Sequence, residues 1–154
     1  MTILEWGALG EMVGGFAVVI SLIYVGLQIR QNSKSVSASS QIALRQLSTY
    51  MTSQLAAPEM ARIYINGLND SLSLPPEDRV RFHSLMLSLF GIYEAFYFQG
   101  YFGTIPKKHQ ASNNMATFHL RRPGVRRWWD DGGRDQFSEG FVESLEKSID
   151  NTGA

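Results

Sequence analysis

The stretch from Met12 to Ile29, MVGGFAVVISLIYVGLQI, decides the fold of this chain. It holds no charged residue, and only Ser21, Tyr24 and Gln28 carry polar side-chain atoms. At the helical rise of about 1.5 Å per residue the stretch spans about 27 Å, close to the thickness of a bilayer's hydrocarbon core. It therefore predicts a helix that crosses a membrane.

Two other interpretations of this run are open: a buried helix of a soluble domain, and a cleaved signal peptide. A signal peptide begins with a basic segment, but the residues before the run include Glu5 and Glu11 and no Lys or Arg. The sequence SVSAS at 35–39 resembles a cleavage site loosely and lies beyond Arg30 and Lys34. Length and flanking residues favour a retained membrane helix over both alternatives.

The basic residues near the run set its expected orientation. Arg30, Lys34 and Arg45 follow the run, whereas the residues before it are acidic or neutral. Lys and Arg are in excess on the cytoplasmic side of membrane helices. We therefore expect the N-terminus outside and the rest of the chain in the cytoplasm.

Small residues recur at helical spacing along one face of the expected helix: Gly7, Gly10, Gly14, Ala17 and Ser21. Small side chains let two membrane helices approach closely, and Gly10 with Gly14 forms a GxxxG pair. Glycine is also simply frequent in membrane helices. We interpret the stripe as a helix-packing interface for another membrane protein or for a second copy of this chain.

Composition excludes several kinds of chemistry. The chain has 14 Lys and Arg against 14 Asp and Glu, so no net charge attracts nucleic acid. It has no cysteine, which excludes disulfides, thiolate metal sites and cysteine nucleophiles. His83, His109 and His119 lack the carboxylate spacing of a metal site in a helical bundle. We expect no cofactor, no metal and no enzymatic activity.

The remaining chain predicts an all-α fold, with a helical stalk over 31–57 and a cytoplasmic helical domain over 58–150. The anchor is assigned to 1–30, and 151–154 to a disordered tail. In the stalk, one apolar face is expected, and the serines between 33 and 40 mark a place where the helix could kink. That face comprises Val36, Ala43, Leu47, Tyr50, Met51 and Leu55.

Proline, glycine and acidic residues predict the boundaries of the later helices. Pro58 suits the first turn of one helix and Gly67 its end, and Pro76 opens a longer helix that reaches about residue 102. Its uncharged centre is short for a membrane span, so a core helix is expected, with a re-entrant helix as the alternative. A weaker helix over 107–122 and a last helix, capped by Ser138 and ending near Ile149, complete the prediction.

Four segments together resemble a family of small bacterial single-pass membrane proteins of unknown function. They are GGFAVVISLIYVGLQIRQN, PEDRVRFHSLMLSLFGIYEAFYFQ, PGVRRWW and FSEGFVESL, in this order. Family members more often have an acidic, Trp-containing segment where this chain has PKKHQASNNMATFHL. The resemblance implies a bacterial inner-membrane anchor with a helical cytoplasmic domain, and it supplies no catalytic residues.

Two further groups of residues are candidates for function. The segment RRPGVRRWW holds Arg121, Arg122, Arg126, Arg127, Trp128 and Trp129. It could contact an anionic lipid or another phosphate, or the tryptophans could complete the core while the arginines pair with nearby acids. Glu94 lies in an apolar stretch, where it could form a buried polar contact that includes His83.

Two functions follow from these features. The first is a non-enzymatic accessory or assembly subunit that binds a larger membrane-protein complex through the small-residue face. The second is a homo-oligomer that forms a pore or a signalling element.

Overall fold

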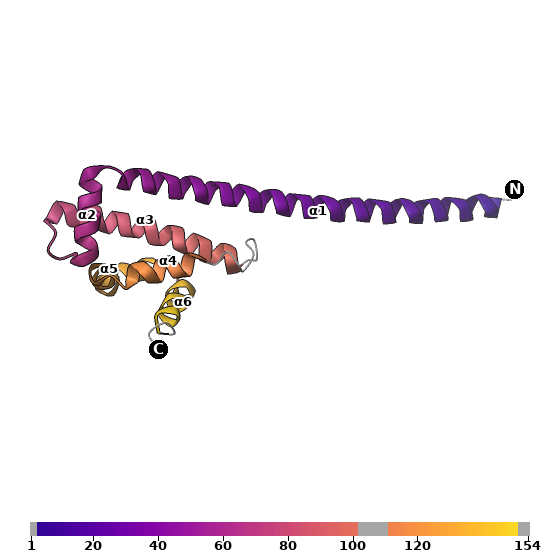
Figure 1. The fold of residues 1–154 in the computed structure, drawn as a ribbon. Helices are drawn as coiled ribbons and strands as arrows, with labels where there is room; N and C mark the ends of the chain where they lie inside the picture. Colours follow the sequence, from indigo (N-terminus) through magenta and orange to yellow (C-terminus); the bar gives the residue numbers. More distant parts are fainter. Residues whose placement is uncertain (1–2, 102–110, 151–154) are drawn as a thin grey trace. The chain divides into compact units, whose positions relative to one another are not determined.

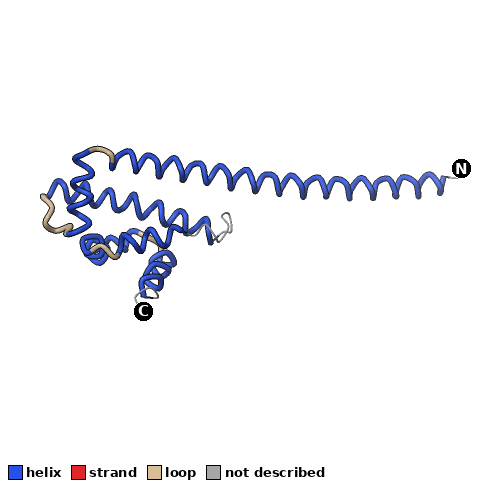
Figure 2. Tube along the Cα trace, viewed as in Figure 1, coloured by secondary structure: helices blue, strands red, loops and turns tan. Residues whose placement is uncertain are grey.

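The computed structural model describes residues 3–101 and 111–150, and every regular element among them is a helix (Figures 1 and 2). The all-α prediction is confirmed for these residues. The elements are α1 (Ile3–Leu55), α2 (Pro58–Asn69), α3 (Pro76–Tyr101), α4 (Ala111–Leu120), α5 (Pro123–Trp128), the π-type segment η2 (Trp129–Gly133), the 3₁₀ turn η3 (Arg134–Gln136) and α6 (Glu139–Asp150). The expected helical residues 107–110 and the expected tail 151–154 lie outside the described residues.

The chain divides into two compact units, Met1–Gln41 and Ile42–Ala154, and α1 contributes residues to both. We call them the N-terminal unit and the C-terminal unit. The division falls inside the segment that the sequence assigns to a stalk, because the end of α1 belongs to the C-terminal core. Met51, near the end of α1, is 8% exposed and packs in that core.

The described N-terminal unit is helical without a break through its serine-rich part. Ser21 and Ser33 donate hydrogen bonds from their hydroxyls to the backbone oxygens of Ala17 and Ile29, at 2.8 and 2.9 Å. Such bonds can bend a helix, but α1 is continuous from Ile3 to Leu55, the serines between 33 and 40 included. The expected risk of a kink is therefore not realised.

The C-terminal unit is built around α3, and α4 runs alongside it (Figure 1). α2 also contacts α3, α5 contacts α2 and α4, and α6 contacts α4. The largest fully buried side chains of the core come from several of these helices: Phe82, Phe90, Trp129, Phe141, Ile63 and Met86. Each such side chain contributes about 1.5–3 kcal/mol by leaving water. The expectation of a core helix at α3 is confirmed.

The predicted apolar face of the stalk is partly wrong. Leu44 and Met51 are buried, whereas Val36, Leu47 and Tyr50 are exposed. The end of α1 carries apolar residues on two sides, and the side that meets the core is the buried one. The helical repeat of apolar residues in the sequence does not show which of the two apolar sides will be buried.

The helix starts follow the prolines, but one expected helix end does not follow its glycine. Pro58 and Pro76 begin α2 and α3, as predicted. Gly67 does not end α2, which continues to Asn69. Gly67 instead lies buried where α2 crosses α5: a methyl group on Gly124 of α5 would lie 1.9 Å from its backbone oxygen.

Candidate functional site

The apolar part of α1 is exposed along its whole described length. Between Met12 and Ile29 the large apolar side chains are exposed by between 47% for Val25 and 67% for Leu22. No residue of its most apolar window is buried within the described structure. By length and composition this helix could cross a membrane. Such exposure is the reverse of what the core helix of a soluble domain shows.

The five small residues of α1 lie on an open face. A methyl group added at Gly7, Gly10 or Gly14 would meet no atom within 4 Å. Ser21 donates its hydroxyl to the backbone of Ala17, so it presents no unbonded donor to a neighbour. At 3.6 residues per turn, bulky Phe16 and Val19 lie on the opposite side. The face can accept another helix at close range.

The two tryptophans of RRPGVRRWW are core residues. Trp129 is fully buried, Trp128 is 7% exposed, and both indole rings lie within about 5.5 Å of the Phe90 ring. Trp128 Nε1 donates to His83 Nδ1 at 2.9 Å, and Trp129 Nε1 donates to Glu146 Oε1 at 3.0 Å. Neither indole is placed to contact a lipid.

The second arginine pair of that segment is also used within the fold. Arg126 contacts Asp130 at 2.9 Å and Glu146 at 3.1 Å, so it links α5 to α6. These carboxylates stabilise its cation and raise the pKa of Arg126, and the hydrogen bond that Arg126 donates to Asp130 contributes most.

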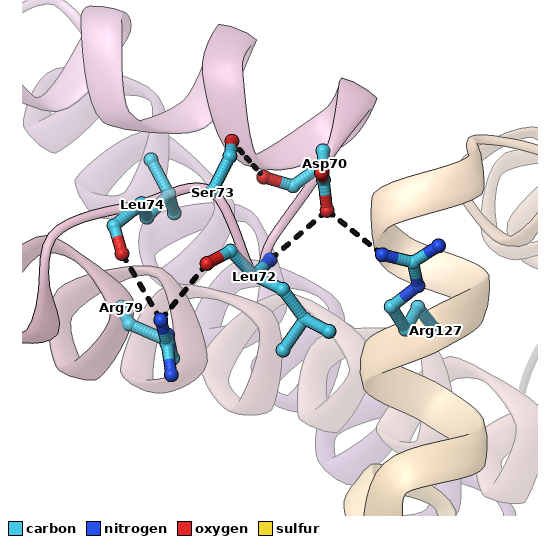
Figure 3. Close-up of polar contacts among 6 residues, drawn as sticks. All are labelled: Asp70, Leu72, Ser73, Leu74, Arg79 and Arg127. Carbon is cyan, nitrogen blue, oxygen red and sulfur yellow. Dashed lines mark hydrogen bonds and ion pairs between the residues drawn. The ribbon is translucent and has the colours of Figure 1, made fainter.

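Arg127 stabilises the connection between α2 and α3. It contacts Asp70 Oδ1 at 3.1 Å, and the same oxygen accepts the backbone N–H of Leu72 (Figure 3). Arg79 donates to the backbone oxygens of Leu72 and Leu74 in the same turn (Figure 3). The turn is therefore held from α3 and from α5.

The first pair, Arg121 and Arg122, differs from the second. Both side chains are exposed, and neither makes an ion pair with a described residue. The Arg122 guanidinium lies 5.1 Å from the centre of the Phe118 ring, within the range of a cation–π contact. The sequence places these six residues in one segment, but the structure gives them three different environments. Trp128 and Trp129 are buried, Arg126 and Arg127 are ion-paired, and Arg121 and Arg122 are exposed.

Glu94 and His83 bind different partners. Glu94 is half-buried, and its Oε1 accepts the backbone N–H and the hydroxyl of Ser138, both at 2.7 Å. Ser138 precedes α6 as predicted, but its hydroxyl bonds across to α3 instead of capping α6 itself. His83 is bonded to Trp128, as described above. Each contact joins α3 to a later part of the chain.

One polar cluster in the core has no signal in the sequence: it is formed by His119, Tyr64 and Tyr93. Tyr64 Oη lies 2.8 Å from His119 Nε2, and Nδ1 lies 2.8 Å from the backbone oxygen of Met115 and 3.2 Å from Tyr93 Oη. A carbonyl only accepts, so Nδ1 carries the proton and Nε2 accepts from Tyr64. The partners are far apart in sequence, and no local pattern signals them.

Burial controls the ionisation of this cluster. Loss of hydration lowers the pKa of His119 below 6.5, and the nearby Arg122 cation lowers it further, although the bond to Met115 opposes this. Burial also raises the pKa of Tyr64 and of Tyr93. All three side chains are neutral at neutral pH, and together they join α2, α3 and α4.

No group of three or more His, Asp or Glu in the described residues is placed to hold a metal ion. An open hollow of about 410 Å³ lies beside α6. Its lining is Arg126, Arg134, Asp135, Phe137, Glu139, Val142 and Glu146. Side chains of both charge signs surround it, so it favours no single ligand charge.

Comparison of the chain with protein-family models, with curated proteins and with solved structures finds no match.

Proposed function

We propose that this protein is a membrane-anchored, non-enzymatic accessory or assembly subunit that binds a larger membrane-protein complex through the small-residue face of α1. The observation that carries the proposal is that every large apolar side chain between Met12 and Ile29 is exposed. Leaving these side chains in water costs on the order of 20 kcal/mol. This exceeds the whole stability of a typical domain, about 5–15 kcal/mol. A bilayer removes that cost.

The proposed topology places the N-terminus outside and the C-terminal unit in the cytoplasm of a bacterial cell. Arg30 and Lys34 support it, because they follow the apolar segment directly. The chain has no cysteine, so single cysteines introduced at Trp6 and Ser53 would report each side. A membrane-impermeant thiol reagent should label the first in intact cells and the second only after lysis. The reverse pattern would overturn the orientation.

Membrane insertion has its own test. The chain should stay in the membrane fraction after washes with alkaline carbonate and with urea, and leave it only in detergent. Release by carbonate would mean that α1 is covered by a protein in water, and the anchor proposal would fall.

The small-residue face accounts for partner binding. Lipid tails give little hydrophobic drive between helices, so association depends on close backbone approach. Gly14→Leu should fill the open face and reduce co-purification of the partner about tenfold, as loss of 1–2 kcal/mol predicts. Val19→Leu, on the opposite side of the helix, is the matched control and should change little.

Native mass measurement after mild-detergent extraction identifies the partner class. Other membrane proteins bound to the chain would support an accessory subunit. A series of identical subunits would instead support a homo-oligomeric pore or signalling element, and a bound cofactor or metal would contradict a non-enzymatic role.

In the co-purification assay, equal losses from Gly14→Leu and Val19→Leu would show general destabilisation and refute the use of the small-residue face.

A further inference from the structure

The exposed side of α4 and the turn after it combine two apolar side chains with two cations. Met115 is 56% exposed and Phe118 is 55% exposed, one helical turn apart. Arg121 and Arg122 follow in the turn after α4, and the Arg122 guanidinium lies 5.1 Å from the centre of the Phe118 ring. We call these four residues the α4 face.

The charge of the α4 face is not balanced by the fold. The described segment from Ala111 to Arg122 contains no Asp or Glu, and neither Arg121 nor Arg122 pairs with a described carboxylate. Arg126 and Arg127, by contrast, are bound to acids of the same unit. The α4 face therefore presents positive charge beside apolar surface.

We propose that the α4 face docks on an anionic lipid surface, the cytoplasmic leaflet of the membrane that α1 spans. Interfacial helices place Phe and other apolar side chains at the headgroup boundary and Arg beside them. The cytoplasmic leaflet is negatively charged and attracts basic residues held near it. This charge complementarity distinguishes a lipid surface from a neutral apolar partner.

The docking proposal rests on the proposed membrane anchor. Anchoring keeps the C-terminal unit near one leaflet, so even weak contact is favoured by a high effective concentration. The docking adds a role for Arg121, Arg122, Met115 and Phe118 that partner binding through α1 does not include. It excludes Trp128 and Trp129, which the core buries.

The absence of cysteine allows a direct test on the full chain. Met115→Cys carries a polarity-sensitive dye, and the protein is reconstituted into vesicles of neutral phosphatidylcholine or of the same lipid with one third phosphatidylglycerol. The emission maximum of the dye should shift to shorter wavelength in the anionic vesicles alone. Lipid-borne nitroxides should quench the emission only there. Val80→Cys, on exposed α3 surface, is the matched control position and should not respond.

Removing the positive charges tests whether Arg121 and Arg122 are the residues that dock. At about fivefold per basic residue near an anionic surface, Arg121→Gln with Arg122→Gln should weaken docking about 25-fold. Arg134→Gln with Lys147→Gln removes the same net charge from exposed ion pairs and should change it little. Raising the salt concentration should also weaken docking of the α4 face on the anionic vesicles.

Each other outcome would overturn the proposal. No dye response in anionic vesicles, or an equal response in neutral ones, refutes anionic-lipid docking while leaving the anchor intact. A response that grows with protein density in neutral vesicles assigns the face to a second copy of the chain. If carbonate extracts the chain from neutral vesicles, the anchor itself is refuted. This extraction assay does not depend on the dye.

Discussion

Gly124→Ala should destabilise the C-terminal unit because it forces α2 and α5 apart. The added methyl group would lie 1.9 Å from the backbone oxygen of Gly67 and 3.0 Å from the backbone nitrogen of Asp70. Non-bonded carbon atoms rest about 3.5–4.0 Å apart. Backbone atoms cannot rotate out of the way as a side chain does, so α5 must move by about an ångström or more.

The magnitude follows from two opposing terms. Overpacking a close contact costs about 1–3 kcal/mol, and the rigid backbone contact places this case at the upper end. Alanine recovers about 0.5–1 kcal/mol relative to glycine in a helix. The net expected loss is about 2 kcal/mol, and a shift of α5 would also lengthen the 3.1 Å contact between Arg127 and Asp70.

Gly91→Ala provides the matched control. A methyl group there would meet no atom within 4 Å, so the same substitution in α3 should stabilise the unit by about 0.5–1 kcal/mol. Urea unfolding of the full chain in detergent measures both, with Trp6→Phe as background so that emission reports Trp128 and Trp129. If Gly124→Ala proved as stable as the parent, or if both variants shifted stability in the same direction, the close crossing of α2 and α5 would be refuted.

Two further changes test buried polar contacts of the C-terminal unit. Burial lowers the pKa of His119 below 6.5, so as pH falls the unfolded chain binds a proton there before the folded chain does. The free energy of unfolding should therefore be constant above about pH 7 and fall as pH drops below 6.5. Urea titrations from pH 8 to 5 should show this slope in the parent and not in His119→Gln, and equal slopes would contradict it. Glu94→Ala should cost about 1–3 kcal/mol because the backbone N–H of Ser138 loses its acceptor, whereas Ser138→Ala keeps that bond and should cost about 1 kcal/mol, so equal losses would disprove the distinction.

Local sequence signals located the helices well where their physical cause is local. Pro58 and Pro76 begin helices because proline has no N–H to lose and a φ angle suited to the first turn. The last helix is equally clear, since Phe141 and Leu145 repeat at helical spacing and both are buried. Such signals depend on the nearest few residues, which the sequence states directly.

Signals with two local interpretations failed or stayed open. Glycine often ends a helix, yet Gly67 lies inside α2 because another helix crosses it there. Val36 and Leu47 looked like core positions, but Leu44 and Met51 are buried instead. In each case a residue's role depends on a neighbour that is distant along the chain.

By itself, the sequence determined that the chain is helical and that one helix is apolar enough to cross a membrane, because helix geometry and hydropathy are properties of consecutive residues. Only the tertiary structure decided which polar residues are used inside the fold. It placed Trp128 and Trp129 in the core, tied Arg127 to Asp70, joined His119 to Tyr64, and left Arg121 and Arg122 facing outward. These assignments depend on contacts between residues far apart in sequence, and they exist only once the helices have packed.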